Sequence, residues 1–182
     1  IKNKKNIPAS KGILFILLAF IFLLYLHNKS IIQIPVLTSP YQSEMEEVIK
    51  KDSRNEGISV SIYTRGPAIL VYDIKSFSGD KTITDMFRVF LQFAEKLSKE
   101  NFKEVYLANK GEVKFKIKGN YFKQLGEEYS EQNPIYTMRT FPENVLNPDG
   151  TNAYSGWEGG ILGVTTKQLE DFNDLNQKWY FY

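Results

Sequence analysis

The chain has 182 residues and contains no cysteine, which excludes disulfides, cysteine nucleophiles and cysteine-ligated zinc. Its 23 lysine and arginine residues nearly balance its 21 aspartate and glutamate residues. Four of the lysines precede residue 12, so the remaining chain carries 19 basic and 21 acidic side chains. A nearly neutral domain lacks the basic surface that nucleic-acid binding requires, so we predict no nucleic-acid partner.

An uncharged apolar run, GILFILLAFIFLLYL, extends from Gly12 to Leu26. A helix needs about 20 residues to cross the hydrocarbon core of a bilayer. Isoleucines a few residues farther on extend the apolar run toward that length. The sequence therefore predicts a transmembrane signal-anchor at residues 12–34 that contacts membrane lipid. Residues 35–182 are long enough to form one domain with its own hydrophobic core.

More positive charge precedes this run than follows it. The lysines in front are Lys2, Lys4, Lys5 and Lys11. Only Lys29 follows the run closely. Because lysine and arginine accumulate on the cytoplasmic side of a span, residues 1–11 are predicted to be a cytoplasmic N-terminus. The domain would then be periplasmic or extracellular, held by a single pass through the cytoplasmic (inner) membrane of a bacterium.

Two other interpretations of the apolar run are open. A cleavable signal peptide shares the basic front and the apolar middle, but no A-x-A cleavage pattern precedes His27. A buried helix of a soluble protein would show a polar face, and this run shows none. We therefore favour a retained anchor over both alternatives.

The first elements of the domain follow from capping and alternation. A Ser-x-x-Gln capping box at residues 39–42 predicts a helix that ends near Gly57. Residues 58–63 alternate between apolar and polar side chains, which is typical of a half-buried strand. Residues 68–74 form a mainly apolar run that suits an interior strand, and the two strands are expected to pair as a hairpin.

The middle of the chain contains the clearest amphipathic helix, which we expect to begin at Thr82 or Thr84. Its apolar stripe consists of Ile83, Met86, Phe87, Phe90, Phe93, Ala94 and Leu97. Strands at residues 104–108 and 112–118 follow and are joined by a tight turn. Asn120 then caps a short helix.

The last part of the chain is less regular. Residues 135–141 are predicted to form a strand, residues 142–160 a loop without periodicity, and residues 161–164 a short strand. Thr165 and Gln168 resemble a second capping box, which predicts a C-terminal helix. Together these elements predict an α+β fold with one mostly antiparallel sheet and helices packed on it.

The loop at residues 142–160 is the first candidate binding site, because long loops are often functional. The residues of interest in it or beside it are Arg139, Glu143, Asp149, Tyr154, Trp157 and Glu158. Trp157 could be a stacking platform for a carbohydrate or a peptide, and two carboxylates could form the acid–base pair of a glycoside hydrolase. Alternatively, residues 147–150 form an ordinary turn and Trp157 fills the core.

A row of lysines is the second candidate site. Lys114, Lys116 and Lys118 project from one face of a predicted strand, with Lys110 and Lys123 nearby. Lysines on a strand usually mark a solvated face or a protected edge. The functional alternative is contact with anionic lipid headgroups or with an acidic protein partner.

Several kinds of chemistry are missing from the domain. The single histidine, His27, lies beside the predicted span, so residues 35–182 contain neither a Ser-His-Asp triad nor a histidine metal site. No nucleotide-binding or metal-binding motif is present, and we predict no cofactor, no metal and no catalytic residue.

The sequence therefore favours a membrane-anchored binding protein, an accessory subunit of a bacterial envelope complex with protein partners in or at the membrane. One alternative is a periplasmic immunity or inhibitor protein that captures a toxin or an enzyme. Another is a carboxylate-based hydrolase of a cell-envelope polymer.

Overall fold

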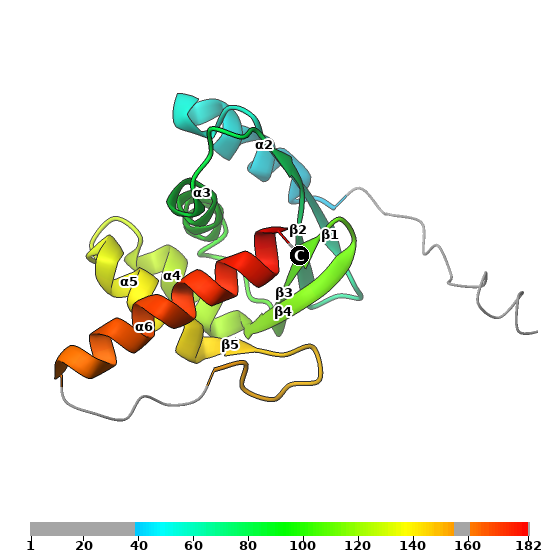
Figure 1. Ribbon diagram of the computed structural model, residues 1–182. Coiled ribbons are helices and arrows are strands. Elements are labelled where there is room, and N and C mark those ends of the chain that lie inside the picture. Colours follow the sequence, from blue (N-terminus) through cyan, green and yellow to red (C-terminus); the bar gives the residue numbers. More distant parts are fainter. Residues whose placement is uncertain (1–38, 155–160, 182) are drawn as a thin grey trace, which may run out of the picture. The chain divides into compact units, whose positions relative to one another are not determined.

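The computed structural model describes residues 39–154 and 161–181 (Figure 1). The chain divides into two units, Ile1–Val36 and Leu37–Tyr182, and the described residues all belong to the second. Within them, no helix combines the length and the apolar character that a membrane crossing requires. The predicted anchor at residues 12–34 lies outside the described residues.

One five-stranded sheet forms the centre of this unit. In spatial order the strands are β1 (Ile58–Thr64), β2 (Ile69–Phe77), β3 (Glu104–Asn109), β4 (Glu112–Lys118) and β5 (Val145–Leu146). Three of the four pairings are antiparallel, whereas β2 and β3 are parallel. The α+β class and both predicted hairpins are confirmed. The sheet is mixed because a helix carries the chain from β2 back to the start of β3.

Helix α3 (Ile83–Lys96) makes this crossover and packs on the sheet. Its capping box at the N-terminus joins Thr82 and Asp85, each of whose side chains accepts the other's backbone N–H. The predicted apolar stripe is confirmed as core. Phe90 is fully buried and meets Tyr72 of β2 edge to face, with ring centroids 5.2 Å apart. Buried aromatic pairs of this kind supply much of the apolar surface that stabilises the fold.

Helix α4 (Gly119–Glu128) lies very close to α3. A Cβ atom at Gly126 would lie 2.2 Å from the carbonyl oxygen of Ala94 in α3, which is closer than any real contact. Glycine at this position therefore allows the two helix backbones to approach each other. The predicted short helix is confirmed, but the predicted cap is wrong: Asn120 lies inside the helix, and Lys118 at the N-cap position makes no side-chain cap bond.

Helix α2 (Gln42–Lys51) was predicted, but its first turn differs from the expectation. Ser39 accepts the backbone N–H two residues farther on, whereas the side chain of Gln42 does not close a capping box. Instead, Gln42 bonds to the outer backbone of β1. Its Oε1 accepts the N–H of Ile62 at 2.7 Å, and its Nε2 donates to the carbonyl of Val60 at 3.4 Å. The helix also ends before the predicted stop at Gly57.

Residues 135–141, predicted as a strand, form helix α5 (Pro134–Thr140) instead. The side chain of Asn133 caps it by accepting the N–H of Ile135 at 2.9 Å, and Pro134 occupies the first helical turn. A short apolar run does not by itself distinguish a strand from a helix, so the cap decides the outcome here.

Residues 161–164, also predicted as a strand, belong to helix α6 (Ile161–Asn176). The predicted capping box is also wrong, because Thr165 and Gln168 lie inside this helix and not at its start. Gln168 is buried, and its side-chain oxygen accepts a bond from Arg139 Nε at 2.9 Å, which joins α6 to α5. The glycines around residues 161–164 suggested a break that the helix does not make.

A π-helical turn, η3 (Gln177–Phe181), follows α6 and reaches the sheet. Asn109 at the end of β3 donates to the carbonyl oxygens of Trp179 at 2.9 Å and Tyr180 at 2.8 Å. The indole N–H of Trp179 donates to Ala108 at 3.3 Å. These bonds fix the fully buried indole of Trp179 in the core.

Candidate functional site

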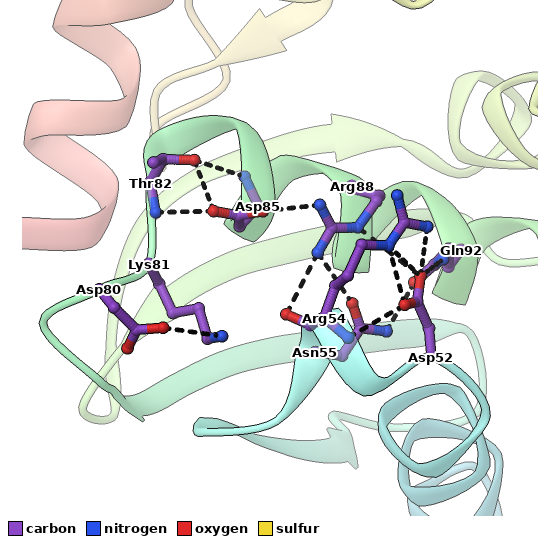
Figure 2. A network of polar contacts seen from close by, with 9 residues as sticks. All are labelled: Asp52, Arg54, Asn55, Asp80, Lys81, Thr82, Asp85, Arg88 and Gln92. Carbon is purple, nitrogen blue, oxygen red and sulfur yellow. Dashed lines mark hydrogen bonds and ion pairs between the residues drawn. The ribbon is translucent and has the colours of Figure 1, made fainter.

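Polar side chains from the residue after α2, from the short turn η1 (Ser53–Asn55) and from α3 converge in one network (Figure 2). Asp52 directly follows α2 and receives the Arg54 guanidinium at 2.6 Å and the Gln92 amide at 3.0 Å. Asn55 is buried, and its amide donates to the side-chain oxygen of Gln92 at 2.7 Å. These bonds tie the end of α2 to the middle of α3.

Arg88 joins the same network from the preceding turn of α3, and Figure 2 shows its guanidinium between the neighbouring polar groups. It donates to Asp85 at 2.6 Å and to Asn55 Oδ1 at 3.2 Å, and it lies 3.9 Å from the Asp52 carboxylate. The cluster thus consists mainly of paired charges and hydrogen-bonded amides.

The pairing keeps the carboxyl groups ionised. Hydrogen bonds from Arg54 hold the pKa of Asp52 well below its ordinary value of 3.8. The hydroxyl and backbone N–H of Thr82 lower the pKa of Asp85 to about 2. Proton transfer near neutral pH requires a pKa close to that pH, so neither group is suited to general acid–base catalysis.

A groove of about 790 Å³ opens beside this network, between α2 and α3. Asp52 and Gln92 line it where the network meets the groove. The other lining residues are Glu47, Val48, Lys51, Ser53, Glu95, Lys96, Ser98, Lys99 and Tyr129. Tyr129 follows α4 and contributes its ring to the lining of the groove. One wall of the groove is therefore aromatic.

The rim of the groove carries charges of both signs. Lys96 of α3 pairs with Glu47 of α2 at 2.5 Å, which links the two helices. Lys51, Lys99 and Glu95 also line the groove and are exposed to solvent. In residues 39–154 and 161–181, no three or more metal-ligating side chains gather together. The groove is thus equipped for hydrogen bonding and ion pairing with a ligand.

Two smaller hollows continue from this groove along α4. Tyr129 also lines a hollow of about 30 Å³. That hollow shares Leu125, Glu128 and Thr137 with a third one, of about 210 Å³, which lies between α4 and α5. The three hollows therefore follow one another from α2 to α5.

The part of the predicted loop that the structure describes is ordered. Pro142–Asn144 forms a helical turn, η2, and β5 then pairs with β4. Asp149 lies in the turn after β5, where it accepts the backbone N–H of Thr151 at 2.9 Å and its hydroxyl at 2.7 Å. Glu143 lines the hollow between α4 and α5, and Asp149 does not. The structure therefore does not bring these two carboxylates together as an acid–base pair.

The other residues predicted for the loop site are dispersed. Arg139 joins α5 to α6, as described above. The hydroxyl of Tyr154 donates to Asp174 of α6 at 2.8 Å, so this side chain fastens the loop to the helix. Trp157 and Glu158 lie outside the described residues, and their role in binding stays a prediction.

The predicted lysine row is mostly paired. Lys114 lies 2.8 Å from Glu112, and Lys116 lies 3.1 Å from Glu104. Their side chains are only 16 % and 13 % exposed, which suits a protected sheet face more than a surface for lipid headgroups. Lys118 is exposed, and its contact with a partner stays a prediction.

The groove was not predicted from the sequence, because its residues come from separate elements. Asp52 and Gln92, for example, are 40 positions apart. One signal was present in α3. Arg88 and Gln92 lie four positions apart, on one face of a helix that is otherwise mainly apolar. Such a polar pair marks the place where the helix leaves the core and meets another element.

Similarity assigns neither the fold nor the groove to a known group. Comparison of the chain with protein-family models, with curated proteins and with solved structures found no match. The geometry of the groove and of the hollows beside it is therefore the basis for a functional proposal.

Proposed function

We propose that this chain is a membrane-anchored binding protein that holds an extended segment of a partner polypeptide in the groove between α2 and α3. The groove itself carries the proposal, with a volume of about 790 Å³, a hydrogen-bonded floor and a rim of both charges. Two further hollows continue it along α4. A line of hollows suits an extended chain better than a compact small molecule.

The chemistry of the groove also matches a polypeptide. The hydroxyls of Ser53 and Ser98 can bond to the amides and carbonyls of an extended backbone. Lys99 and Glu95 can pair with side chains of either sign. Tyr129 supplies a large, partly buried ring, and such rings are common anchors at protein interfaces.

The predicted anchor gives the proposal its cellular setting. The excess of lysines before residues 12–34 supports a cytoplasmic N-terminus and a domain on the outer side of the inner membrane. We accordingly favour an accessory subunit of an envelope complex, whose partner segment lies close to the membrane.

Site-specific photo-crosslinking in membranes tests the groove. A photoreactive residue in place of Lys99 is expected to crosslink a partner polypeptide, and the same residue at the exposed Asp80, which does not line the groove or the hollows beside it, is the control. The double variant Lys51→Glu, Glu95→Lys is expected to abolish the Lys99 crosslink while the circular dichroism spectrum stays the same. Equal crosslinking at both positions, or a crosslink that survives the double variant, would contradict the proposal.

The kind of partner distinguishes the two binding functions. A crosslinked protein that stays in the membrane supports an accessory subunit, and a soluble toxin or enzyme supports an immunity or inhibitor protein. Alkaline extraction tests the anchor separately. The full-length chain is expected to stay in the membrane fraction, and its release would show that residues 12–34 are not a retained span.

A further inference from the structure

The hollow between α4 and α5 differs in character from the groove. Its volume is about 210 Å³. Two tyrosine rings and two carboxylates line it, from Tyr121, Tyr136, Glu128 and Glu143. None of the described residues that line it is a lysine or an arginine. The hollow is therefore aromatic and negatively charged, without a cation of its own.

The two rings come from different helices. Tyr121 of α4 stacks on the buried Phe141 with ring centroids 6.1 Å apart. Tyr136 of α5 is 51 % exposed. A ligand in the hollow would thus contact one ring that is packed against Phe141 and one ring that is open to solvent. Cations bind favourably to the faces of such rings.

The carboxylates are positioned to receive a positive charge. Glu128 accepts a bond from Gln124 at 2.9 Å, which orients it. Burial raises the pKa of Glu143, because the carboxylate is partly withdrawn from water. The pKa of Tyr121 is raised by burial and then by Glu143, so this carboxylate acts on the interior of the hollow. A bound cation would offset both effects.

We propose that the hollow between α4 and α5 binds the ammonium group of a lysine side chain. The carboxylates pair with its charge, and the tyrosine rings contact its methylene groups and its cationic head. The inference rests on the proposed function for the source of this side chain, the bound polypeptide. Leu125, Glu128 and Thr137 connect the hollow to the one that adjoins the groove. A segment that occupies the groove and continues past Tyr129 would bring its side chains to this hollow.

A bare metal ion fits this hollow less well. Magnesium and calcium take six or more oxygen ligands. The described residues offer no group of three or more metal-ligating side chains, here or elsewhere. An alkylammonium ion needs fewer direct ligands, because its methylene groups gain from contact with the rings.

Ligand-observed NMR with the full-length protein in detergent tests the site directly. Nα-acetyl-lysine methylamide is the probe, and Nα-acetyl-norleucine methylamide is its uncharged analogue. We expect the lysine derivative to bind at least about tenfold more tightly, as a charge-assisted contact implies. Equal binding of the two would overturn the proposal.

Variants locate the binding. Glu143→Gln is expected to weaken the lysine derivative about tenfold, and Tyr136→Ala about fivefold, with the thermal unfolding midpoint unchanged. Glu127→Gln is the matched control, since Glu127 is exposed on α4 and does not line the hollow. If this control weakens binding as much as Glu143→Gln does, the site lies elsewhere.

A second probe identifies the source of the cation. Tetramethylammonium is expected to bind more weakly than the lysine derivative, because it lacks the methylene chain and cannot donate a hydrogen bond. Tighter binding of tetramethylammonium would assign the hollow to a free quaternary ammonium compound and overturn the assignment to lysine.

The failure of this inference and the failure of the proposed function give different results. If Lys99 crosslinks a partner but the lysine derivative does not bind, the groove function stands and the cation site is wrong. If the lysine derivative binds at Glu143 but no crosslink forms at Lys99, the cation site stands and the groove function is wrong.

Discussion

The helices α3 and α5 begin in similar ways, but their side chains have different roles. Each has a side-chain cap, from Thr82 in α3 and from Asn133 in α5. Seven residues of α3 are buried, whereas none of α5 is, and Ile135 and Tyr136 of α5 are more than half exposed. Capping therefore sets where a helix begins, and packing decides whether it stabilises the core or remains available for a partner.

Removing a ring from α3 is the strongest test of this difference. Phe90→Ala is expected to lower the free energy of unfolding by about 3–5 kcal/mol, because it leaves a cavity among buried rings. Urea denaturation measures the loss. A loss below about 1 kcal/mol would mean that α3 is not the central element of the core.

The carboxylate of Asp85 at the start of α3 makes the stability of the fold depend on pH. The cap of α5 is a neutral amide and has no such effect. The pKa of Asp85 is about 2 in the folded protein and 3.8 ordinarily, so its ionised form stabilises the fold at pH above about 4. This contribution falls as the pH drops toward 2. Asp85→Asn is expected to cost about 1–2 kcal/mol at neutral pH, and the cost should shrink between pH 4 and pH 2.

Unfolding curves of the two proteins across this pH range measure the effect. The exposed variant Glu127→Gln is the control, since it alters a carboxylate without a cap. A cost of Asp85→Asn that stays constant with pH would show that the carboxylate acts through its shape and not through its charge.

Removing the two caps compares the helices directly. Thr82→Ala is expected to lower global stability by about 1 kcal/mol, because α3 unfolds only with the core. Asn133→Ala should instead speed hydrogen exchange within α5 and change global stability by less than about 0.5 kcal/mol. Equal global losses would place α5 in the same cooperative unit as α3.

The smallest expected effect on stability belongs to an exposed ring of α5. Tyr136→Ala is expected to change the free energy of unfolding by less than about 0.5 kcal/mol, since the side chain is 51 % exposed. The same variant is expected to weaken ligand binding in the hollow. A large loss of stability would mean that Tyr136 serves the fold, and the contrast between the two helices would disappear.

The elements that sequence patterns predicted well are those with strong local signals. The structure agrees with the predicted apolar stripe of α3. It also agrees with the predicted turn at Lys110 and Gly111 and with the two strands that this turn joins. The parallel pairing of β2 with β3 was not predicted, because it depends on how α3 packs and not on the strands themselves. Helix α5 was missed because the pattern of Ile135 to Phe141 is ambiguous.

The candidate site was harder to predict than the fold. Asp52, Gln92 and Tyr129 meet only because α2, α3 and the end of α4 are packed together. The residues that drew attention in the sequence, such as Asp149, are occupied by short-range turn contacts. A pattern of neighbouring residues predicts local structure only, so a groove built from three separate elements is hard to recognise in the sequence.

The side chain of Gln42 has a consequence for the protein at high concentration. The outer side of β1 is an open sheet edge, and such edges recruit strands from other molecules and promote aggregation. By bonding to Val60 and Ile62, Gln42 occupies the position where a foreign strand would begin to pair. One amide thus blocks part of this edge against pairing with a second copy of the domain.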